Sequence, residues 1–541
     1  MQKGVFMQTT VWQPEAECYR AFLPLDLPPE ATFVYRNNNN MATSVPNPNV
    51  YALGGMDWTL ESHDMVVAGD VQTGRYVLAG ALTANRSMTY FTVIRKGRLV
   101  GISVRQPFIK PGEQPEELLV LEGPDWRELM IQYADAAAKK MGVKPIDATK
   151  NITGYCTWYY YYADVSEKNL LDNLAALKSN RDPYAAQVVQ IDDGYQTHQG
   201  DWLDQRDAWP TPLKTIAEEI TSAGMEAGIW TMPMLASTAS RVFKEHPDWF
   251  VKDEKGEPLA IRGWSPPPDH HWLCLDATLP AVQEHLAHVF QTFRSWGYTY
   301  FKMDGLGYGL AIGRRHDPDA TPVSAFRLAL KAIRNAVPDA TLLGCFPPFM
   351  PCLGLVDNCR VSGDTSRYYY AKGPDYANFD ADTGCSIRHA MHVTMANWWK
   401  YDRWFRCDPD TLMARQDNAF YTYGEAKMSV LTGIITGVCI TSDNLGTIAS
   451  DRLALLGRAQ ELRLKDATPF EWPMDYWPQV FTGTVNGRKA VAIFNDCDHE
   501  MTYEFDKYGL PEECDELLDV PSVRKKKIIL PAHDAALIVA K

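Results

Sequence analysis

Residues 280–304, PAVQEHLAHVFQTFRSWGYTYFKMD, contain a helix, a break and a strand in one run. Pro280 suits the first turn of a helix, and Gly297 is a residue at which helices commonly end. Between them, one helical face is apolar and consists of Val282, Leu286, Val289, Phe290 and Phe293. The strand YTYFKMD follows and finishes on Asp304. The segment therefore predicts a helix–strand unit with a carboxylate at the carboxyl end of its strand.

The same alternation recurs on both sides of this segment. Thr211 and Pro212 predict a capped helix that ends at Gly224, directly before the strand EAGIWTM. Strand-like runs occur at GYCTWYYY, QVVQIDD, EAGIWTM, YTYFKMD, TLLGCF, NCRVSGD, RWFRCD and GVCITSD. Parallel strands need helical crossovers, so this pattern predicts an α/β fold with a (β/α)8 TIM barrel over residues 149–455. Catalytic groups in such barrels gather at the carboxyl ends of the strands.

The regions on either side of the predicted barrel have the character of antiparallel sheets. Residues 1–148 contain short alternating runs separated by turn residues, including a hairpin turn at Arg95–Arg98. Residues 456–541 return to strand pairs, one of them joined by Asn486-Gly487, a strong hairpin signal. We therefore expect an N-terminal β-sandwich, the barrel, and a small C-terminal antiparallel β-domain.

Charge and composition exclude several classes of protein. The 541 residues include 53 Lys and Arg against 67 Asp and Glu, for a formal net charge of −14. A chain this acidic lacks the basic surface of a nucleic-acid or anionic-membrane binder. The first residues lack the apolar core of a signal peptide, and the apolar stretch 428–442 is too short to span a bilayer. We expect a cytoplasmic protein with reduced cysteines, and homo-oligomerisation stays open.

Two carboxylates carry the predicted chemistry. Asp304 in YFKMDGLGYG and Asp364 in RVSGDTSRYY each follow an apolar strand and begin a loop. Paired carboxylates suit glycosidic bond cleavage, in which one attacks the anomeric carbon and the other protonates the leaving oxygen. Lys302 and Arg360 share the faces of these acids, where they would keep Asp304 ionised and bind sugar hydroxyls. The alternative is purely structural: Asp-Gly as a turn and Gly-Asp-Thr as a helix cap.

The pair Asp192-Asp193 in VVQIDDGYQ leaves more alternatives open. Adjacent acids at a strand end can ligate Mg²⁺ or Ca²⁺, accept hydrogen bonds from two sugar hydroxyls, or cap the next helix. His270-His271 lacks the partners of a zinc site, and residues 379–384, FDADTG, lack the closing Glu of a calcium loop. We therefore expect no metal and no cofactor. An aldolase with Lys302 as a Schiff-base amine, and a non-catalytic sugar-binding protein, are the other classes of function.

Taken in order, the motifs resemble those of glycoside hydrolase family 36, the α-galactosidase and raffinose synthase group. The resemblance covers about residues 154–455 and rests on GYCTWYYYY, IDDGY, AGMEAGIWTMPMLASTASRVFKEHPDWFV, YFKMDGL, LLGCFPPFMPCLGLVDNCRVSGD and ITSDNLG. It departs from the family pattern at Thr157 and Tyr195, and in the loops that follow Asp304 and Asp364.

The resemblance implies a role for each matched residue. Asp304 would be the nucleophile and Asp364 the acid/base of a retaining mechanism, with Asp192 and Asp193 accepting hydrogen bonds from O6 and the axial O4 of galactose. Lys302 and Arg360 would bind O2 and O3. Further substrate-binding residues are expected at the pocket floor, at strand ends and on the N-terminal domain: Cys345, Trp230, Trp158, Asp443 and Trp58, with the loop 37–40 as an alternative to Trp58.

These expectations combine into one functional hypothesis. The protein would be an exo-acting, retaining α-galactosidase that hydrolyses terminal α-galactosides of short oligosaccharides such as melibiose or raffinose. The departures in the two loops leave an alternative, an α-N-acetylgalactosaminidase or a transglycosylase of the raffinose-synthase kind. The expected partner is a small oligosaccharide, without nucleic acid or membrane.

Overall fold

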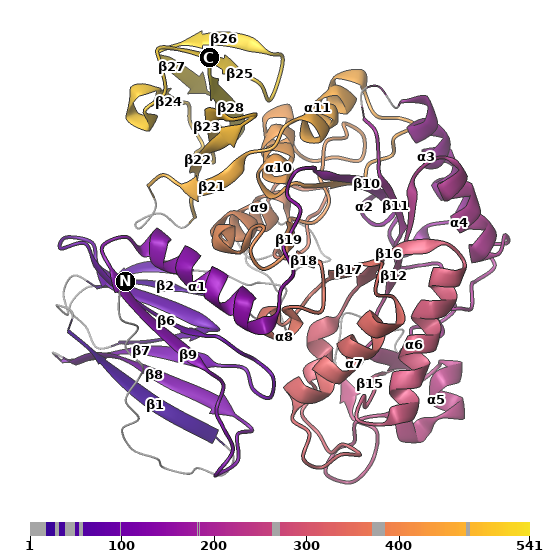
Figure 1. The fold of residues 1–541 in the computed structure, drawn as a ribbon. Coiled ribbons are helices and arrows are strands. Elements are labelled where there is room, and N and C mark those ends of the chain that lie inside the picture. Colours follow the sequence, from indigo (N-terminus) through magenta and orange to yellow (C-terminus); the bar gives the residue numbers. More distant parts are fainter. Residues whose placement is uncertain are drawn as a thin grey trace.

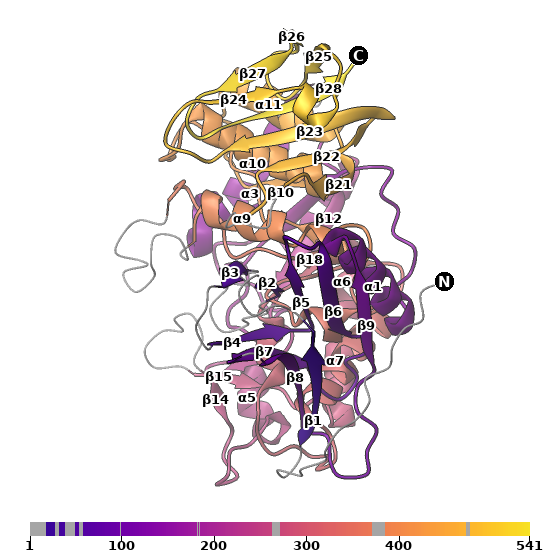
Figure 2. The same cartoon turned by 90° about the vertical axis from the view of Figure 1, so that its left-hand side faces the viewer.

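The computed structural model describes residues 18–26, 32–37, 49–53, 58–97, 99–180, 182, 184–261, 271–370, 385–471 and 477–541. Three parts follow one another along the chain: two antiparallel sheets, a parallel barrel with its helices, and a second antiparallel region (Figure 1). Both antiparallel parts lie on the same side of the barrel (Figures 1 and 2). Among the described residues, no helix is both long enough and apolar enough to cross a membrane.

The N-terminal part is a β-sandwich, as predicted. One sheet has the order β1 (Cys18–Leu25), β8 (Leu99–Pro107), β7 (Tyr90–Lys96), β4 (Trp58–His63). The other has the order β3 (Asn49–Leu53), β2 (Thr32–Arg36), β5 (Met65–Asp70), β6 (Arg75–Ala81), β9 (Leu118–Gly123). The turn at Gly97 joins β7 to β8 as the hairpin that the sequence indicates.

Alternation along the central strands explains how the sandwich is joined to the barrel. In β5, Val66 and Ala68 point into the core between the two sheets, whereas Met65 and Val67 belong to the cluster shared with the barrel. Helix α1 (Trp126–Met141) covers this second face, and the Asp125 side chain caps its first turn. The five-stranded sheet is therefore buried on both sides.

The central part is a nearly closed barrel of eight parallel strands. Their order is β19 (Arg406–Asp408), β18 (Asn358–Arg360), β17 (Thr341–Gly344), β16 (Tyr298–Met303), β12 (Glu226–Thr231), β11 (Val188–Ile191), β10 (Ile152–Cys156), β20 (Val438–Thr441). Leu412 closes the seam between β19 and β20, because its N–H donates to the Ile440 carbonyl at 2.7 Å. All eight predicted strand runs thus become barrel strands.

Helices surround the barrel, and short elements extend the loops at its strand ends. The helices are α3 (Glu167–Ser179), α4 (Leu213–Ser222), α6 (Pro280–Ser295), α7 (Pro322–Ala336), α9 (Ile387–Ala396), α10 (Tyr423–Thr436) and α11 (Ser450–Glu461). The short elements are α2 (Trp158–Tyr161), α5 (Arg241–Glu245), α8 (Phe349–Cys352), and a small sheet of β13 (Leu235–Ser237), β15 (Trp272–Cys274) and β14 (Ala260–Ile261).

Local details differ from the sequence expectations at three places. Residues 158–161, read as part of a strand, form helix α2. Thr211 does not cap α4, because its hydroxyl donates to Glu167 and Pro212 occupies the cap position. The predicted domain limit at 455/456 falls inside α11, whereas the limit at 148/149 falls between α1 and β10.

The C-terminal part is an antiparallel sheet with the order β21 (Lys465–Pro469), β22 (Val480–Val485), β23 (Arg488–Asn495), β28 (Asp534–Ala540), β25 (Glu513–Glu516), β26 (Ser522–Lys525). A two-stranded sheet of β24 (Met501–Glu504) and β27 (Lys527–Leu530) accompanies it. Asn486-Gly487 turns between β22 and β23 with both φ angles positive, at 50° and 76°. The hairpin predicted from these residues is therefore present.

Candidate active site

The carboxyl ends of the barrel strands bring most of the predicted site residues together. Asp192 and Asp193 follow β11, Trp230 lies in β12, and Asp304 follows β16. Further residues come from the next strands, with Cys345 directly after β17 and Arg360 at the end of β18. Because the strands are parallel, all of these positions lie at one end of the barrel.

Asp192 and Lys302 form a buried ion pair at the base of this site. Lys302 Nζ lies 2.9 Å from Asp192 Oδ2, and the side chains are 5% and 3% exposed. Gln190 Nε2 donates to the same oxygen at 2.6 Å. Burial alone would lower the pKa of Lys302, but the Asp192 carboxylate, with other anionic groups, raises it well above its usual value. Lys302 is therefore a fixed cation at the site.

Asp304 is oriented by two hydrogen bonds. Trp230 Nε1 donates to Oδ2 at 3.1 Å, and the backbone N–H of Gly305 donates to Oδ1 at 2.6 Å. Gly305 has φ +59°, in the left-handed region that suits glycine, so the chain turns sharply after the carboxylate. The indole of Trp230 is held in turn by an edge-to-face contact with Trp202 at 5.7 Å. These donors fix the orientation of the Asp304 carboxylate.

Asp193 lies deeper than Asp304 and has a different electrostatic state. Gln196 Nε2 donates to its Oδ1 at 2.6 Å. Burial raises the pKa of Asp193 to about 6, and the neighbouring charges of Asp192 and Asp304 act in the same direction. The charge of Asp304 therefore contributes to the raised pKa of Asp193.

Asp364 is a partly accessible carboxylate in the loop after β18. Its side chain is 40% exposed and pairs with the buried guanidinium of Arg360. Arg360 Nη1 also lies 3.8 Å from Asp410 Oδ2, so one cation serves two carboxylates. Arg360 is therefore shared between Asp364 and Asp410.

The sites of Asp304 and Asp364 are electrostatically connected. Burial raises the pKa of Tyr308 to about 12, and both carboxylates add to this shift. Burial likewise raises the pKa of the Cys345 thiol, again with contributions from both acids. Tyr308 and Cys345 thus lie within electrostatic range of both carboxylates.

The remaining predicted residues have other surroundings. Asp443 is fully buried, and its oxygens accept hydrogen bonds from the backbone N–H groups of Ala414 and Arg415 and from the Arg415 guanidinium. It fixes a loop and does not join the other site residues. Trp158 is half-buried against the barrel-interior cluster. The Trp58 side chain and residues 38–40 of the loop 37–40 lie outside the described residues.

Two site residues were missed by sequence reasoning. Asp408 ends β19, and burial raises its pKa to about 6. Asp410 accepts hydrogen bonds from the Tyr159 hydroxyl and, at 2.9 Å, from the backbone N–H of Thr365. The run RCDPD carries the same strand-end acidic signal as IDD, so this signal could have revealed Asp408 and Asp410.

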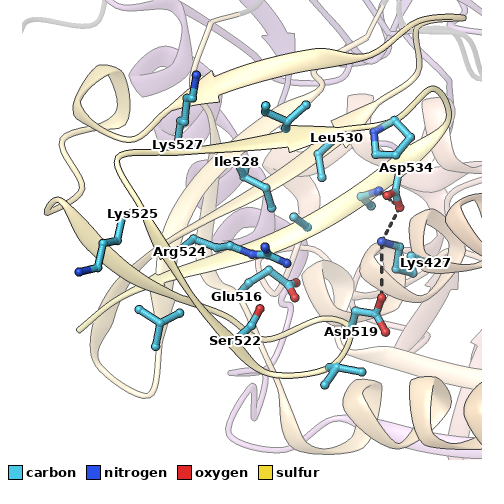
Figure 3. Close-up of a pocket in the computed structure, with 16 residues that line it drawn as sticks. Lys427, Glu516, Asp519, Ser522, Arg524, Lys525, Lys527, Ile528, Leu530 and Asp534 are labelled. Carbon is cyan, nitrogen blue, oxygen red and sulfur yellow. Dashed lines mark hydrogen bonds and ion pairs between the residues drawn. The ribbon is translucent and has the colours of Figure 1, made fainter.

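A cavity of about 750 Å³ lies elsewhere, in the C-terminal part, and has a different chemistry (Figure 3). Lys427, a buried cation in the lining of this cavity, forms ion pairs with Asp534 at 2.6 Å and with Asp519 at 3.9 Å. Lys525 and Lys527 point away from this ion-pair cluster (Figure 3).

Within the described residues, no three His, Cys, Asp or Glu side chains converge as a metal site requires. The paired acids at the barrel strand ends are therefore the candidate active site.

Comparisons with known proteins relate the chain to the α-galactosidases. The melibiase family model matches residues 155–318, which include Asp192, Asp193 and Asp304. The α-galactosidase AgaA of Geobacillus stearothermophilus is 27% identical over 196 residues, which cover 34% of this chain and 26% of that protein. An A type blood α-D-galactosamine galactosaminidase of Flavonifractor plautii is 30% identical over 128 residues, covering 22% of this chain and 12% of that protein. These alignments thus span about a quarter or less of either relative.

Solved structures extend the similarity to nearly the whole chain. The α-galactosidase TtGalA of Thermus thermophilus, solved with p-nitrophenyl α-D-galactopyranoside, superposes with a TM-score of 0.68 at 21% identity and covers 87% of this chain and 92% of that chain. The family 36 α-galactosidase AgaA superposes with a TM-score of 0.66 at 11% identity and covers 96% and 76%. The similarity to glycoside hydrolase family 36 found in the motifs is thereby confirmed: residues 155–318 match the melibiase family model, within a chain that has the fold of the family 36 α-galactosidases.

Proposed function

We propose that the protein is a glycoside hydrolase, a retaining exo-α-galactosidase that hydrolyses terminal α-galactosides of short oligosaccharides. The observation that carries the proposal is the arrangement of two unlike carboxylates at the barrel strand ends. Asp304 is held by Trp230 and Gly305, as suits a nucleophile, whereas Asp364 is partly exposed and paired with Arg360. Family 36 similarity supports the same pair of acids.

In the first step, a carboxylate oxygen of Asp304 attacks the anomeric carbon from the face opposite the leaving group. A bond from Asp304 to this carbon forms as the glycosidic bond breaks, and Asp364 gives its proton to the leaving oxygen. Asp364 enters this step as the carboxylic acid, with Arg360 beside it. Asp410, 3.8 Å from Arg360, offers the guanidinium a second anion when Asp364 is neutral.

In the second step, Asp364 takes a proton from water while the water oxygen attacks the anomeric carbon. The bond to Asp304 breaks, and its electron pair returns to the carboxylate. Two inversions give net retention of the α-configuration. Asp192 and Asp193 accept hydrogen bonds from the sugar, and a site that pairs with the axial O4 of galactose rejects glucose, in which this hydroxyl is equatorial.

Turnover of three 4-nitrophenyl glycosides tests the proposal: the α-galactoside, the α-glucoside and the α-N-acetylgalactosaminide. Wild type should cleave the α-galactoside selectively, and Asp304→Ala should lower kcat by at least about 10⁴-fold. Added azide should partly restore Asp364→Ala on this activated substrate, because a small anion can replace the water that Asp364 no longer activates. Activity confined to the glucoside, or undiminished in Asp304→Ala, would contradict the assignment.

A second candidate is α-N-acetylgalactosaminidase activity. The similarity to the Flavonifractor plautii enzyme, which is named for the 2-amino sugar α-D-galactosamine, favours a sugar substituted at C2. Preference for the N-acetylated substrate in the same assay would select it. Transglycosylation of the raffinose-synthase kind uses the same double displacement with a sugar hydroxyl in place of water. Trisaccharide formation in excess sucrose would identify this third outcome.

A further inference from the structure

The segment that follows Asp364 is held by the barrel at its beginning. The backbone N–H of Thr365 donates to Asp410 at 2.9 Å, and the N–H of Ser386 donates to the Asp364 carbonyl at 3.2 Å. Residues 368 and 369 then run beside the start of α9, where the N–H groups of Ile387 and Arg388 donate to their carbonyls at 3.0 and 3.1 Å. Barrel contacts therefore fix the direction of the segment as it leaves Asp364.

A residue of the C-terminal β-domain holds the other end of the segment. Asp496 directly follows β23, and its side chain is 3% exposed. It accepts a hydrogen bond from the Tyr369 hydroxyl, another at 3.0 Å from Arg388 Nε, and lies 2.9 Å from His392 Nε2. Although burial opposes the charge, His392 and Arg388 hold the pKa of Asp496 well below its usual value. Asp496 is thus an ionised acceptor for three groups of the barrel part.

The neighbouring tyrosine, Tyr370, also contacts the C-terminal β-domain. Tyr370 Oη lies 3.1 Å from His533 Nε2, and the Tyr369 ring stacks on His533 with centroids 4.9 Å apart. His533 Nδ1 lies 3.2 Å from Glu425 Oε1 on α10. Consecutive side chains of the segment therefore contact the C-terminal β-domain.

We propose that Asp496 is a positioning residue for Asp364. It binds Tyr369 and Arg388, and thereby fixes the segment Asp364–Tyr370 from which the acid/base projects. Asp496 itself touches neither substrate nor Asp364, and the proposal rests on the proposed role of Asp364. An acid/base must be held within a fraction of an ångström to transfer its proton, so loosening this segment should impair acid catalysis first. The C-terminal β-domain then belongs to the catalytic apparatus.

Two conservative variants test this role, Asp496→Asn and Tyr369→Phe. Cleavage of raffinose needs a proton from Asp364 because the leaving group is a sugar alcohol, whereas 4-nitrophenolate leaves without one. Asp364 acts as base in the second step on either substrate, so kcat/KM, which reports the first step alone, is the quantity to compare. We expect kcat/KM for raffinose to fall about tenfold and kcat/KM for 4-nitrophenyl α-galactoside to fall less than about twofold. A merely structural role would lower both rates by the same factor.

Asp515→Asn is the matched control, because Asp515 pairs with Arg488 within the C-terminal β-domain at 3.0 Å. Hydrogen–deuterium exchange of residues 365–370 provides a readout that needs no substrate. Faster exchange in Asp496→Asn and Tyr369→Phe, but not in Asp515→Asn, would support the role of Asp496 in fixing the segment Asp364–Tyr370. This holds even if wild type cleaves no α-galactoside and the proposed function fails. Unchanged exchange, or equal losses on both substrates, overturns the inference, and Tyr369→Phe decides if Asp496→Asn does not fold.

Discussion

Lys302 and Asp192 form an ion pair that water hardly reaches, and this makes the pair a structural as well as a chemical element. Asp192 Oδ2 accepts from Lys302 and Gln190, and Oδ1 accepts from the Asp193 N–H at 2.9 Å. A buried carboxylate is tolerated only when such partners replace its hydration.

Lys302→Met should therefore destabilise the protein strongly. It keeps the length of the side chain but leaves the Asp192 charge buried without its cation, and removing one partner of a buried pair costs about 3–5 kcal/mol. The control is Lys168→Met, because Lys168 and Asp172 form an exposed pair at 2.6 Å. That variant should change the free energy of unfolding by less than about 0.5 kcal/mol. If urea denaturation gave Lys302→Met and Lys168→Met the same loss in free energy of unfolding, the buried pair would be no more stabilising than the exposed one.

Asp193 predicts a pH dependence of sugar binding. Because its pKa is raised to about 6, the empty site takes up a proton as the pH falls through this value. A protonated carboxyl accepts hydroxyl hydrogen bonds poorly, so the Kd for galactose should rise by up to about tenfold per pH unit below about 6. The folded state binds this proton more tightly than the unfolded state, so Asp193 opposes folding increasingly as the pH rises from about 4 to about 6.

Calorimetric titration of galactose across this range measures the effect. Asp193→Asn should bind galactose more weakly and with little pH dependence. A flat profile in wild type would contradict the assignment of Asp193 as an acceptor.

At the residue level, the sequence was most informative where a side chain follows an apolar strand. Asp192, Asp193, Asp304 and Arg360 are therefore found together at the strand ends. Asp443 follows a strand in the same way, yet it binds Arg415, because spacing does not show which partner a buried acid meets. Asp410 was missed because its role depends on Tyr159 and Thr365, which are distant in sequence.

Among the elements, α10 connects the barrel to the C-terminal β-domain. Thr422 caps its first turn in a capping box with Glu425, and the helix is buried over most of its length. A Cβ built on Gly424 would lie 2.4 Å from the His533 carbonyl oxygen, so β28 begins directly against the helix backbone.

Gly424→Ala should disrupt the contact between α10 and the start of β28. The added methyl group cannot fit without moving His533, and such overpacking costs about 1–3 kcal/mol. Gly446→Ala is the control, because its nearest neighbour is the flexible Asn444 side chain at 3.3 Å. Thermal unfolding should show a lower midpoint for Gly424→Ala alone. A midpoint equal to that of wild type would mean that β28 can shift freely.

Element types were predictable wherever the periodicity was long. The helices at 213–222 and 280–295 follow the 3.6-residue pattern closely, and the alternation of strands with helices indicated the eight barrel strands. The run WYYY was misread as a strand because aromatic residues favour strands, whereas the position directly after β10 requires the chain to turn. Short elements have little periodicity of their own, so their surroundings decide their conformation.

At the scale of the molecule, the β-sandwich and the barrel share one apolar core. Trp399, fully buried after α9, donates its indole N–H to the Tyr35 hydroxyl of β2 at 2.9 Å. The Tyr133 ring of α1 lies 5.8 Å from Trp399 and 6.0 Å from Trp404. Lys400 packs against the same rings, with Nζ 4.5 Å from the Trp399 ring centroid. The sandwich is therefore an integral part of the fold.

Trp399→Ala should weaken the packing between the β-sandwich and the barrel. Removing a buried indole costs about 3–5 kcal/mol, and the sandwich should then unfold in a separate, earlier calorimetric transition. Ile312→Ala is the control, because Ile312 is 71% exposed. A single transition at the wild-type temperature would show that other contacts hold the two parts together.

The position of Asp496 along the chain has a consequence for biosynthesis. A nascent chain that has emerged as far as β20 already contains Asp192, Asp304 and Asp364, but Tyr369 and Arg388 have no Asp496 to bind. At about 5–20 residues per second, the ribosome needs several more seconds to deliver it. On the proposed role of Asp496, full acid catalysis arises only after residue 496 has been made, and a chain released before that point should cleave raffinose slowly.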